Sequence, residues 1–421
     1  MASDNLKNFL ESNPDFPLIA QRLYGKDADV EKAAKRYVEL GEQHIEQFGA
    51  THYRYFSSPG RIELVGNHTD HQHGKVLCAS INLDTLAAVT PTDDGKIVVK
   101  SGAYPLIEVY LNKLDKNLKE FGTSLALVKG VCDYYVKHGF TIGGFVATMT
   151  STVARGSGVS SSASFECCIA EILNVLYNEG KIDPVTKAKA SQYAECTYFG
   201  KPCGLLDQSA IALGGVSYID FADPEQPLVQ KLDWTVDDGV VLLNTGGDHS
   251  KLTDCYAAIT SEMGQVAKLL GGNYLRECDP QGLAVKVKLA GLSGRAALRA
   301  KHFFEENERV EQAKRALLTK DVASLRDALA SSGFSSLVYL QNLYVPGDDK
   351  QPIPLALEIA RETGASAARV HGGGFAGTVL LLYPNQNKRL AAGILAEVYG
   401  EDNVFDVSIR PDGAVFTGVQ M

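Results

Sequence analysis

Residues 154–166 read ARGSGVSSSASFE, a glycine- and serine-rich stretch between a strand-like segment and an amphipathic helix. Gly156 and Gly158 let the backbone turn with its N–H groups pointing inward, and the start of the helix adds a positive dipole end. This combination predicts a phosphate cradle, in which serine hydroxyls add hydrogen bonds and one can bind Mg²⁺. No Gly-Lys-Ser/Thr follows, so it is not a Walker A loop. Alone, the stretch fits a flexible connector with a serine N-cap equally well.

The segments on either side of the cradle predict an α+β protein. Short runs rich in β-branched residues precede it, and glycine-terminated segments with helical spacing follow it. The end of the chain again alternates between strand-like and helical segments, without the regular alternation of a doubly wound sheet. The Gly214-Gly215 pair predicts a boundary between residues 1–215 and 216–421. The expected helices cover residues 29–49, 164–178, 185–199, 207–213, 251–270 and 294–318, and the expected strands include 85–91, 96–100, 106–111 and 144–150.

A second informative stretch, GNHTDHQHG at residues 66–74, places three histidines and an aspartate close together. His68, Asp70, His71 and His73 are all residue types that bind metal ions. The spacing therefore allows a metal site, and the local pattern does not decide between that and a polar binding turn.

A third stretch, AECTYFGKPCGLLDQ at residues 194–208, separates two carboxylates by a glycine- and proline-containing turn. Glu195 falls near the end of one expected helix and Asp207 at the start of the next. Both side chains can therefore face one cavity. The alternative is a solvated helix residue at Glu195 and an N-cap at Asp207.

Composition restricts the class of partner. The chain has 41 basic and 50 acidic residues, a net charge of −9, which disfavours binding to nucleic acid or to an anionic membrane. No apolar run reaches the length of about 18 residues that a membrane span needs. The N-terminal segment lacks the features of a signal peptide, and the eight cysteines form no CxxC pair. We therefore expect a cytoplasmic protein.

Four motifs in order resemble the GHMP family of small-molecule kinases, and within it the galactokinases. The first family motif reads roughly P-G-R-[IV]-N-L-I-G-E-H-T-D-Y-N-G-G, and residues 58–74 read SPGRIELVGNHTDHQHG. The second, G-x-G-L-S-S-S-A-S, is matched by GSGVSSSAS at 156–164. C-G-I-M-D-Q is matched by CGLLDQ at 203–208, and G-G-G-F-G-G by GGGFAG at 372–377. The resemblance implies a two-domain GHMP kinase fold with ATP and a sugar bound between the domains.

The resemblance also implies roles for individual residues. Asp207 corresponds to the aspartate that acts as base toward the C1 hydroxyl of the sugar, and Arg61 to its partner at the transferring phosphoryl group. Ser162 and Glu195 correspond to ligands of Mg²⁺. The implied ATP-binding residues are Gly156, Ser157, Gly158, Val159, Ser160, Ser161 and Ser162. The implied sugar-binding residues are Asn67, His68, Asp70, Gly204 and Tyr256.

The implied activity is an ATP-dependent phosphorylation of the C1 hydroxyl of galactose or a close relative. The resemblance also favours a sugar-binding turn over a metal site at residues 66–74. Two departures from the galactokinase motif leave the identity of the sugar undecided. Asn67 stands where galactokinases carry a glutamate that contacts the C6 hydroxyl, and Asp70-His71-Gln72 is closer to galacturonic acid kinases. A galacturonic acid kinase is therefore the alternative, and an inactive sensor of sugar and ATP is a second. The sequence gives no oligomeric state.

Overall fold

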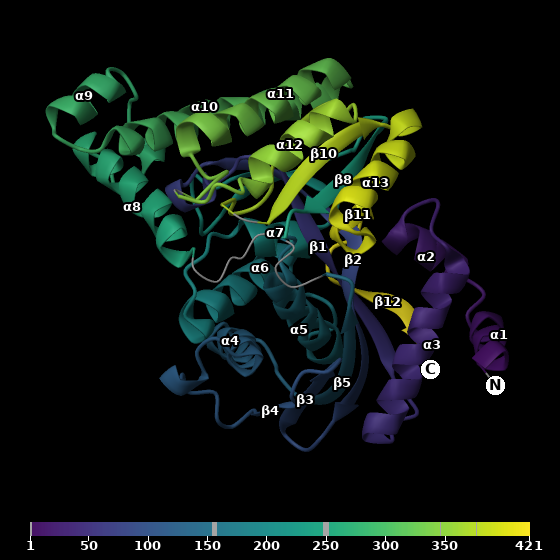
Figure 1. Ribbon diagram of the computed structural model, residues 1–421. Helices are drawn as coiled ribbons and strands as arrows, with labels where there is room; N and C mark the ends of the chain where they lie inside the picture. Colours follow the sequence, from purple (N-terminus) through teal and green to yellow (C-terminus); the bar gives the residue numbers. More distant parts are fainter. Residues whose placement is uncertain (1, 154–157, 247–251, 346, 376) are drawn as a thin grey trace.

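The computed structural model describes residues 2–153, 158–246, 252–345, 347–375 and 377–421. In this part of the chain, helices surround two β-sheets (Figure 1). The architecture is α+β, as the sequence predicts.

The first sheet has eight strands in the order β12-β1-β2-β5-β3-β4, with β6 paired to β2 and β7 paired to β6. Its pairings are antiparallel except for β3 with β5. Its strands are β1 (Arg54–Val65), β2 (Lys75–Thr92), β3 (Lys96–Ser101), β4 (Ile107–Tyr110), β5 (Gly144–Ser151), β6 (Val216–Asp220), β7 (Leu228–Leu232) and β12 (Val415–Gln420).

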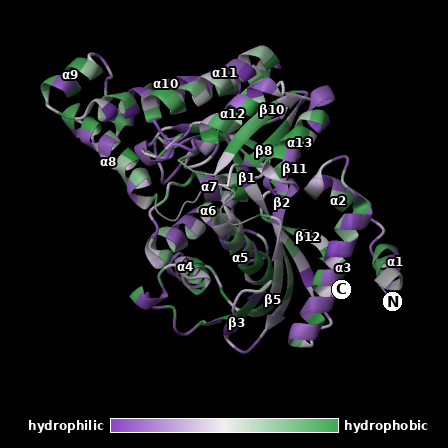
Figure 2. Cartoon of the chain, in the orientation of Figure 1, coloured by the Kyte–Doolittle hydropathy of each residue, from purple (hydrophilic) through white to green (hydrophobic). Residues whose placement is uncertain are grey.

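The second sheet has four antiparallel strands in the order β11-β8-β10-β9. Figure 2 shows hydrophobic colour along β8 and β10, the two central strands, which agrees with their nearly complete burial. Strands buried on both faces read as continuous apolar runs, which explains the sequences VVLL and TVLLLY. The strands are β8 (Asp238–Asn244), β9 (Ala367–Val370), β10 (Thr378–Pro384) and β11 (Val404–Val407).

Helices cover both sheets. Figure 1 shows α3 on one side of the first sheet and α4, α5 and α6 on the other. Helix α11 contacts β1 and β9, so it connects the two sheets, and α10 contacts β1 in the first sheet. The first six helices are α1 (Ala2–Ser12), α2 (Phe16–Tyr24), α3 (Val30–Phe48), α4 (Ser124–Lys137), α5 (Ser161–Tyr177) and α6 (Pro184–Tyr193). The others are α7 (Leu206–Leu213), α8 (Thr253–Leu269), α9 (Leu283–Leu289), α10 (Gly294–Thr319), α11 (Val322–Ser335), α12 (Pro352–Glu362) and α13 (Asn385–Tyr399).

Two helices next to the cradle differ from their expected bounds. Helix α5 begins at Ser161 and not at Ser164, because the serine triplet itself enters the first turn after Ser160, whose φ of 63° is left-handed. Helix α6 ends at Tyr193 and continues as a π-helical turn, Ala194–Phe199, which Gly200 terminates with a φ of 82°. Both changes fix side chains of the expected site.

The expected boundary after residue 215 does not coincide with the division between the sheets. Strands β6 and β7 follow Gly215 but pair within the first sheet, and β12 returns to the same sheet beside β1. The Gly214-Gly215 pair is a turn from α7 into β6, since Gly214 and Gly215 both have positive φ. The second sheet begins only at β8.

Among the described residues, no helix combines the length and the apolar character needed to cross a membrane.

Candidate active site

Arg61 on β1 and Asp207 on α7 form an ion pair at the centre of the candidate site. The Nε–H of the guanidinium donates to Oδ1 of Asp207 at 2.7 Å, and Nη2 lies 2.7 Å from the same oxygen. The Arg61 side chain is 6% exposed, whereas that of Asp207 is 38% exposed. The arginine is therefore fixed by its surroundings, while the carboxylate remains open to a ligand.

The surroundings of Asp207 keep it ionised. Partial burial raises the pKa of its carboxyl, but the charge of Arg61 and hydrogen bonds from Ser160 and Arg61 outweigh burial and hold the pKa below its usual value. The Ser160 hydroxyl donates to Oδ2. A carboxylate with both oxygens engaged by donors and a depressed pKa is a weak base in the free protein. Any ligand that weakens the contact between Arg61 and Asp207 would raise the basicity of Asp207.

The cradle meets this ion pair through its backbone. Arg61 Nη1 donates to the carbonyl of Gly158, and the Arg61 N–H donates to the carbonyl of Val159 at 3.3 Å. Ser161 begins the first turn of α5 and is half-buried. Gly156 and Ser157, which the sequence also assigns to the cradle, lie outside the described residues. The described half of the cradle thus lies directly beside Arg61 and Asp207.

Ser162 and Glu195 lie together, as the resemblance implies. The Ser162 hydroxyl donates to Glu195 Oε1 at 3.1 Å, and Gln208 Nε2 donates to Oε2 at 2.8 Å. Lys201, which sequence reasoning missed, places its Nζ 2.9 Å from Oε1. Burial lowers the pKa of Lys201, but the charge of Glu195 and its hydrogen bond outweigh burial, so the pKa of the lysine is raised. The site therefore presents two adjacent oxygen atoms with a partly exposed lysine beside them.

His68, Asp70 and Gly204 form the wall next to the ion pair. A Cβ atom on Gly204 would lie 1.6 Å from Asp70 Oδ2, so only glycine permits the approach of this carboxylate. Burial, Asp207 and Glu63 raise the pKa of Asp70 to about 6. His68 adopts a left-handed φ of 57°, and its Nε2 lies 3.0 Å from the carbonyl of Gly373. Asp70, His71 and Gly204 also line a cavity of about 560 Å³.

Tyr256 reaches the same region from α8. Its hydroxyl donates to the carbonyl of Gly374 at 3.0 Å, and its ring packs edge-on against Phe375. Burial raises the pKa of the phenol to about 12, so the hydroxyl remains a hydrogen-bond donor near neutral pH. The tyrosine thus fixes the glycine loop that follows β9.

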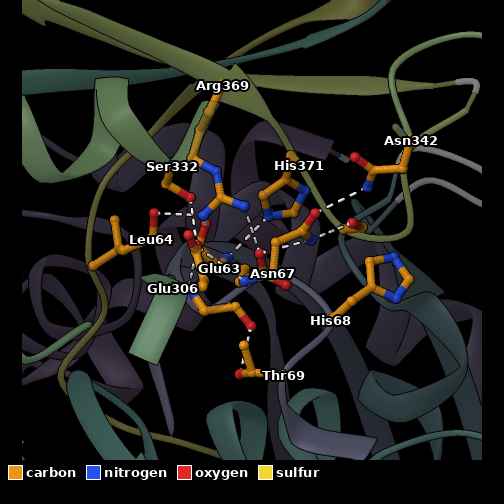
Figure 3. A network of polar contacts seen from close by, with 12 residues as sticks. Glu63, Leu64, Asn67, His68, Thr69, Glu306, Ser332, Asn342, Arg369 and His371 are labelled. Carbon is orange, nitrogen blue, oxygen red and sulfur yellow. Dashed lines mark hydrogen bonds and ion pairs between the residues drawn. The ribbon is translucent and has the colours of Figure 1, made fainter. Parts of the chain in front are cut away.

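Asn67 lies in a buried polar network that connects the two sheets (Figure 3). Its Nδ2 donates to Glu63 Oε1 at 2.9 Å and to the carbonyl of Gly372 at 2.7 Å, and its Oδ1 accepts from Asn342 at 2.9 Å. The residue has no exposed surface. An amide with both of its donors and its acceptor engaged by the protein has little capacity left for a ligand. The arrangement does not favour direct contact between Asn67 and the C6 hydroxyl of a sugar.

The other two histidines of residues 66–74, His71 and His73, have different surroundings. The His71 ring is buried without a hydrogen-bond partner among the described residues, and burial lowers its pKa to about 3. The His73 ring stacks on Tyr274 with 3.6 Å between the ring centroids. Within the described part of the chain, no group of three or more His, Cys, Asp or Glu is arranged to hold a metal ion.

The partners that sequence reasoning missed come mainly from distant parts of the chain. Arg369 Nη2 lies 2.7 Å from Glu63 Oε1, and Glu306 Oε1 accepts from the N–H of Gly66 at 2.9 Å. His302 Nε2 lies 2.9 Å from the carbonyl of Asn67. The only feature of the sequence that pointed to these partners was Glu63 in the segment RIEL, because the family motif has asparagine at this position.

Comparisons with known proteins agree with the order of these motifs. The galactokinase galactose-binding signature matches residues 42–91, and the N-terminal domain of GHMP kinases matches residues 126–215. The galactokinase of Clostridium tetani is 32% identical over 82% of this chain and 87% of its own length. The human galactokinase is 31% identical over 91% of this chain and 97% of its own length.

Solved structures give the same result. The galactokinase of Lactococcus lactis, solved in complex with galactose, matches with a TM-score of 0.79 and 25% identity, over 90% of this chain and all of that one. The mevalonate kinase of Methanococcus jannaschii shares the fold, with a TM-score of 0.61 and 15% identity over 85% of this chain and 98% of its own.

The GHMP kinase domain and the galactokinase relatives identify the chain as a sugar kinase with the GHMP fold. Within that class, the chain belongs to the galactokinase family.

Proposed function

We propose that the protein transfers the γ-phosphoryl group of ATP to the C1 hydroxyl of galactose or a closely related sugar. The observation that carries the proposal is the position of the Arg61–Asp207 pair. It lies between the cradle, at Gly158 and Ser160, and the expected sugar-binding wall at Asp70 and Gly204. A phosphoryl donor and a hydroxyl acceptor bound on these two sides would meet at this pair.

The residues supply what phosphoryl transfer requires. The transition state is loose and spreads negative charge over the equatorial oxygens, so positioning and charge neutralisation dominate. Arg61 is fixed beside the cradle and can neutralise that charge. Phosphate oxygens bound at the cradle would share the charge of Arg61 with Asp207, so the ion pair weakens and the pKa of Asp207 rises. The carboxylate then accepts the proton of the C1 hydroxyl.

Ser162 and Glu195 fit the requirements of a Mg²⁺ site. Mg²⁺ prefers oxygen ligands and is usually held by one or two carboxylates together with water and substrate phosphates. The Ser162 hydroxyl and the Glu195 carboxylate provide adjacent oxygen donors, 3.1 Å apart. Mg²⁺ bound there would neutralise phosphate charge. Lys201, which contacts Glu195 in the structure, has a 62% exposed side chain and is free to turn outward.

Replacing Ser162 by alanine or Glu195 by glutamine should each raise the Mg²⁺ concentration required for half-maximal activity. Each change removes an oxygen ligand or its charge. A Mg²⁺ titration of initial rates at saturating ATP and sugar measures the effect. Ser324→Ala is the control, because its hydroxyl donates to another carboxylate, Asp321 at 2.7 Å, away from the site; it should leave the Mg²⁺ requirement unchanged. Unchanged titration curves for both site variants would contradict the assignment.

The elevated pKa of Asp70 predicts an acid limb in the pH profile. A carboxylate accepts hydrogen bonds from two sugar hydroxyls, whereas its protonated form has lost part of that capacity. Because the pKa is about 6, kcat/KM for the sugar should fall as the pH drops through that value. The profile of kcat/KM against pH reports the ionisations of the free enzyme. Asp70→Asn should lower kcat/KM and remove this limb; a limb that persists in the variant belongs to another group.

Substrate identity is tested by ADP release on a panel of sugars. Galactose, galacturonate, N-acetylgalactosamine, arabinose and glucose cover the alternatives. Release with galactose supports the proposal, and release with galacturonate alone assigns the alternative activity. No release with any of them, combined with sugar and ATP binding by calorimetry, would identify an inactive sensor. The presence of Arg61, Asp207, Ser162 and Glu195 in one site favours activity.

The net charge of −9 supports small-molecule partners, a sugar and ATP, over nucleic acid or an anionic membrane. We further propose that the protein acts in the cytoplasm. Fractionation of cells that express the protein, with antibody detection, tests this location.

A further inference from the structure

Cys196 and Cys203 are two free thiols beside the candidate site that the proposed mechanism does not use. Their Sγ atoms lie 3.6 Å apart, and the Cys203 N–H donates to the Cys196 Sγ at 3.4 Å. Cys196 directly follows Glu195 in the sequence. Cys203 directly precedes Gly204. A covalent change at this pair therefore acts on a residue of the site at each end.

The two thiols are arranged so that a disulfide can form with a small movement. A disulfide places its sulfur atoms about 2.0 Å apart, so the two Sγ atoms need to approach by about 1.6 Å. The chain reverses at Gly200, whose φ of 82° is left-handed, and this reversal brings the thiols together. Six residues separate the two cysteines, and closing so short a loop costs little chain entropy.

The pair is also accessible to a small oxidant. Cys196 and Cys203 are partly exposed, and both line the cavity of about 560 Å³ beside the sugar-binding wall. Oxidation of cysteine favours accessible sulfur atoms. Four other cysteines are buried: Cys78, Cys132, Cys167 and Cys168. The cavity thus gives an oxidant a path to this pair that the buried thiols lack.

Cys203 contacts both parts of the candidate site. Its Sγ lies 3.8 Å from Glu195 Oε2 and 3.8 Å from Gln208 Nε2, which donates to the same carboxylate oxygen. Drawing this sulfur into a disulfide displaces it from both groups. The next residue, Gly204, packs so closely against Asp70 that a Cβ atom there would lie 1.6 Å from Oδ2. A backbone shift at Cys203 therefore alters the sugar-binding wall as well.

We propose that Cys196 and Cys203 form a reversible disulfide when a peroxide enters the cavity, and that this disulfide inactivates the kinase. The inference rests on the proposed function, because it assigns a regulation of the same site. In the proposed cytoplasmic location the thiols are the working form, since disulfides formed there are usually transient. The protein stops consuming ATP while peroxide is present and resumes when the thiols are restored.

The oxidation balances with one molecule of hydrogen peroxide. One thiol attacks a peroxide oxygen, so a sulfur–oxygen bond forms, the O–O bond breaks and the leaving hydroxide takes the thiol proton to give water. The second thiol attacks the sulfenic sulfur, so the S–S bond forms, the S–O bond breaks and a second water leaves. The sulfur atoms lose two electrons and the peroxide gains them. Two molecules of a small thiol such as glutathione reverse the reaction by thiol–disulfide exchange.

The test measures the disulfide and the activity separately on the intact chain. After treatment with hydrogen peroxide and removal of the excess, the peptide that carries both cysteines should be lighter by two hydrogen atoms, and dithiothreitol should restore its mass. The kcat/KM for galactose should fall by about tenfold or more, since a displacement of about 1 Å at a catalytic site can cost about 10²-fold. Dithiothreitol should restore this activity too.

Cys196→Ser should resist the treatment. The serine hydroxyl can accept the hydrogen bond from the Cys203 N–H but cannot form a disulfide. Its kcat/KM after peroxide should therefore stay within about threefold of the value before treatment. If this variant is insoluble, Cys203→Ser takes its place, because the loss of either sulfur removes the disulfide.

Cys278→Ser is the matched control. Cys278 is also partly exposed, but its Sγ contacts the carbonyls of Ala267 and Tyr274, at 3.5 and 3.3 Å. This variant should lose activity on oxidation as the wild type does.

Three results overturn the inference while galactose activity persists: no disulfide after peroxide, a disulfide that leaves kcat/KM unchanged, or equal inactivation of Cys196→Ser and the wild type. Absence of wild-type activity on every sugar would instead overturn the proposed function, and the peptide mass would still decide whether the disulfide forms.

Discussion

Replacing Asp207 by asparagine should lower kcat by about 10²–10⁴-fold, the usual contribution of a general base. The amide preserves the hydrogen bonds of the site, since its oxygen can accept from Arg61 at the position of Oδ1 and its nitrogen can donate to the Ser160 hydroxyl. It cannot accept a proton from the C1 hydroxyl. Sugar binding should therefore survive while turnover is lost. Steady-state kinetics and calorimetric titration with galactose measure the two effects separately.

The control for this variant is Asp238→Asn. Asp238 also accepts two hydrogen bonds from an arginine, Arg326, but lies at the start of β8. Its replacement should leave kcat unchanged at a temperature where the protein stays folded. If Asp207→Asn retains kcat within about threefold of the wild type, then Asp207 only orients the hydroxyl and the base contribution is absent.

Replacing Arg369 by methionine should reduce the free energy of unfolding by about 3–5 kcal/mol, the cost of removing one partner from a buried ion pair. The guanidinium contacts Glu63 at 2.7 Å and the carbonyl of Leu64 at 2.6 Å, and none of its surface is exposed. Methionine fills a similar volume but leaves the Glu63 carboxylate without a cation. Urea denaturation followed by circular dichroism measures the loss.

Arg361→Met provides the comparison for this substitution. Arg361 pairs with Glu358 on α12, but the side chains are 71% and 51% exposed, so water already solvates both charges. Exposed ion pairs of this kind contribute little. The urea midpoint should not move for Arg361→Met. Equal midpoints for Arg369→Met and the wild type would mean that the buried pair contributes nothing to stability.

Local sequence signals predicted some of the helices, whereas α1, α2, α4, α9, α11 and α12 were not among those expected. The helix expected at residues 29–49 is present as Val30–Phe48, because Asp29 caps its start and Gly49 ends it with a left-handed φ of 66°. The helix expected at 294–318 is present as Gly294–Thr319, and the Ser293 side chain caps its start by accepting a hydrogen bond from the Ala296 N–H. These features depend on residues within one turn of each other, so the sequence displays them directly.

Strand pairing was harder to predict because it joins distant residues. Phe56 on β1 pairs with Phe416 on β12, and Cys78 on β2 pairs with Ser217 on β6. No local pattern indicates which strands become neighbours. A glycine pair predicts a turn but not whether the next strand stays in the same sheet, and the strand after Gly215 pairs within the first sheet.

The candidate site likewise combines contacts that motifs predict with contacts between distant residues that they do not predict. The residues carried by motifs, such as Arg61, Asp207, Ser162 and Glu195, lie together as predicted. The network that holds Asn67 was not predictable, because Arg369 is 306 positions from Glu63. The expected contact of Asn67 with the sugar assumed that a motif position has the same surroundings as in relatives. Here its neighbour, Glu63, has changed as well.

The pairing of β12 with β1 has a consequence for the order of synthesis. In the sheet order β12-β1-β2, β1 is an interior strand only when residues 415–420 are in place. While the ribosome is still adding the second sheet, one side of β1 presents unpaired N–H and C=O groups, the kind of edge that recruits other strands. The nascent chain therefore carries the segment from Arg54 to Ser57 on an open edge until residues 415–420 can pair with it.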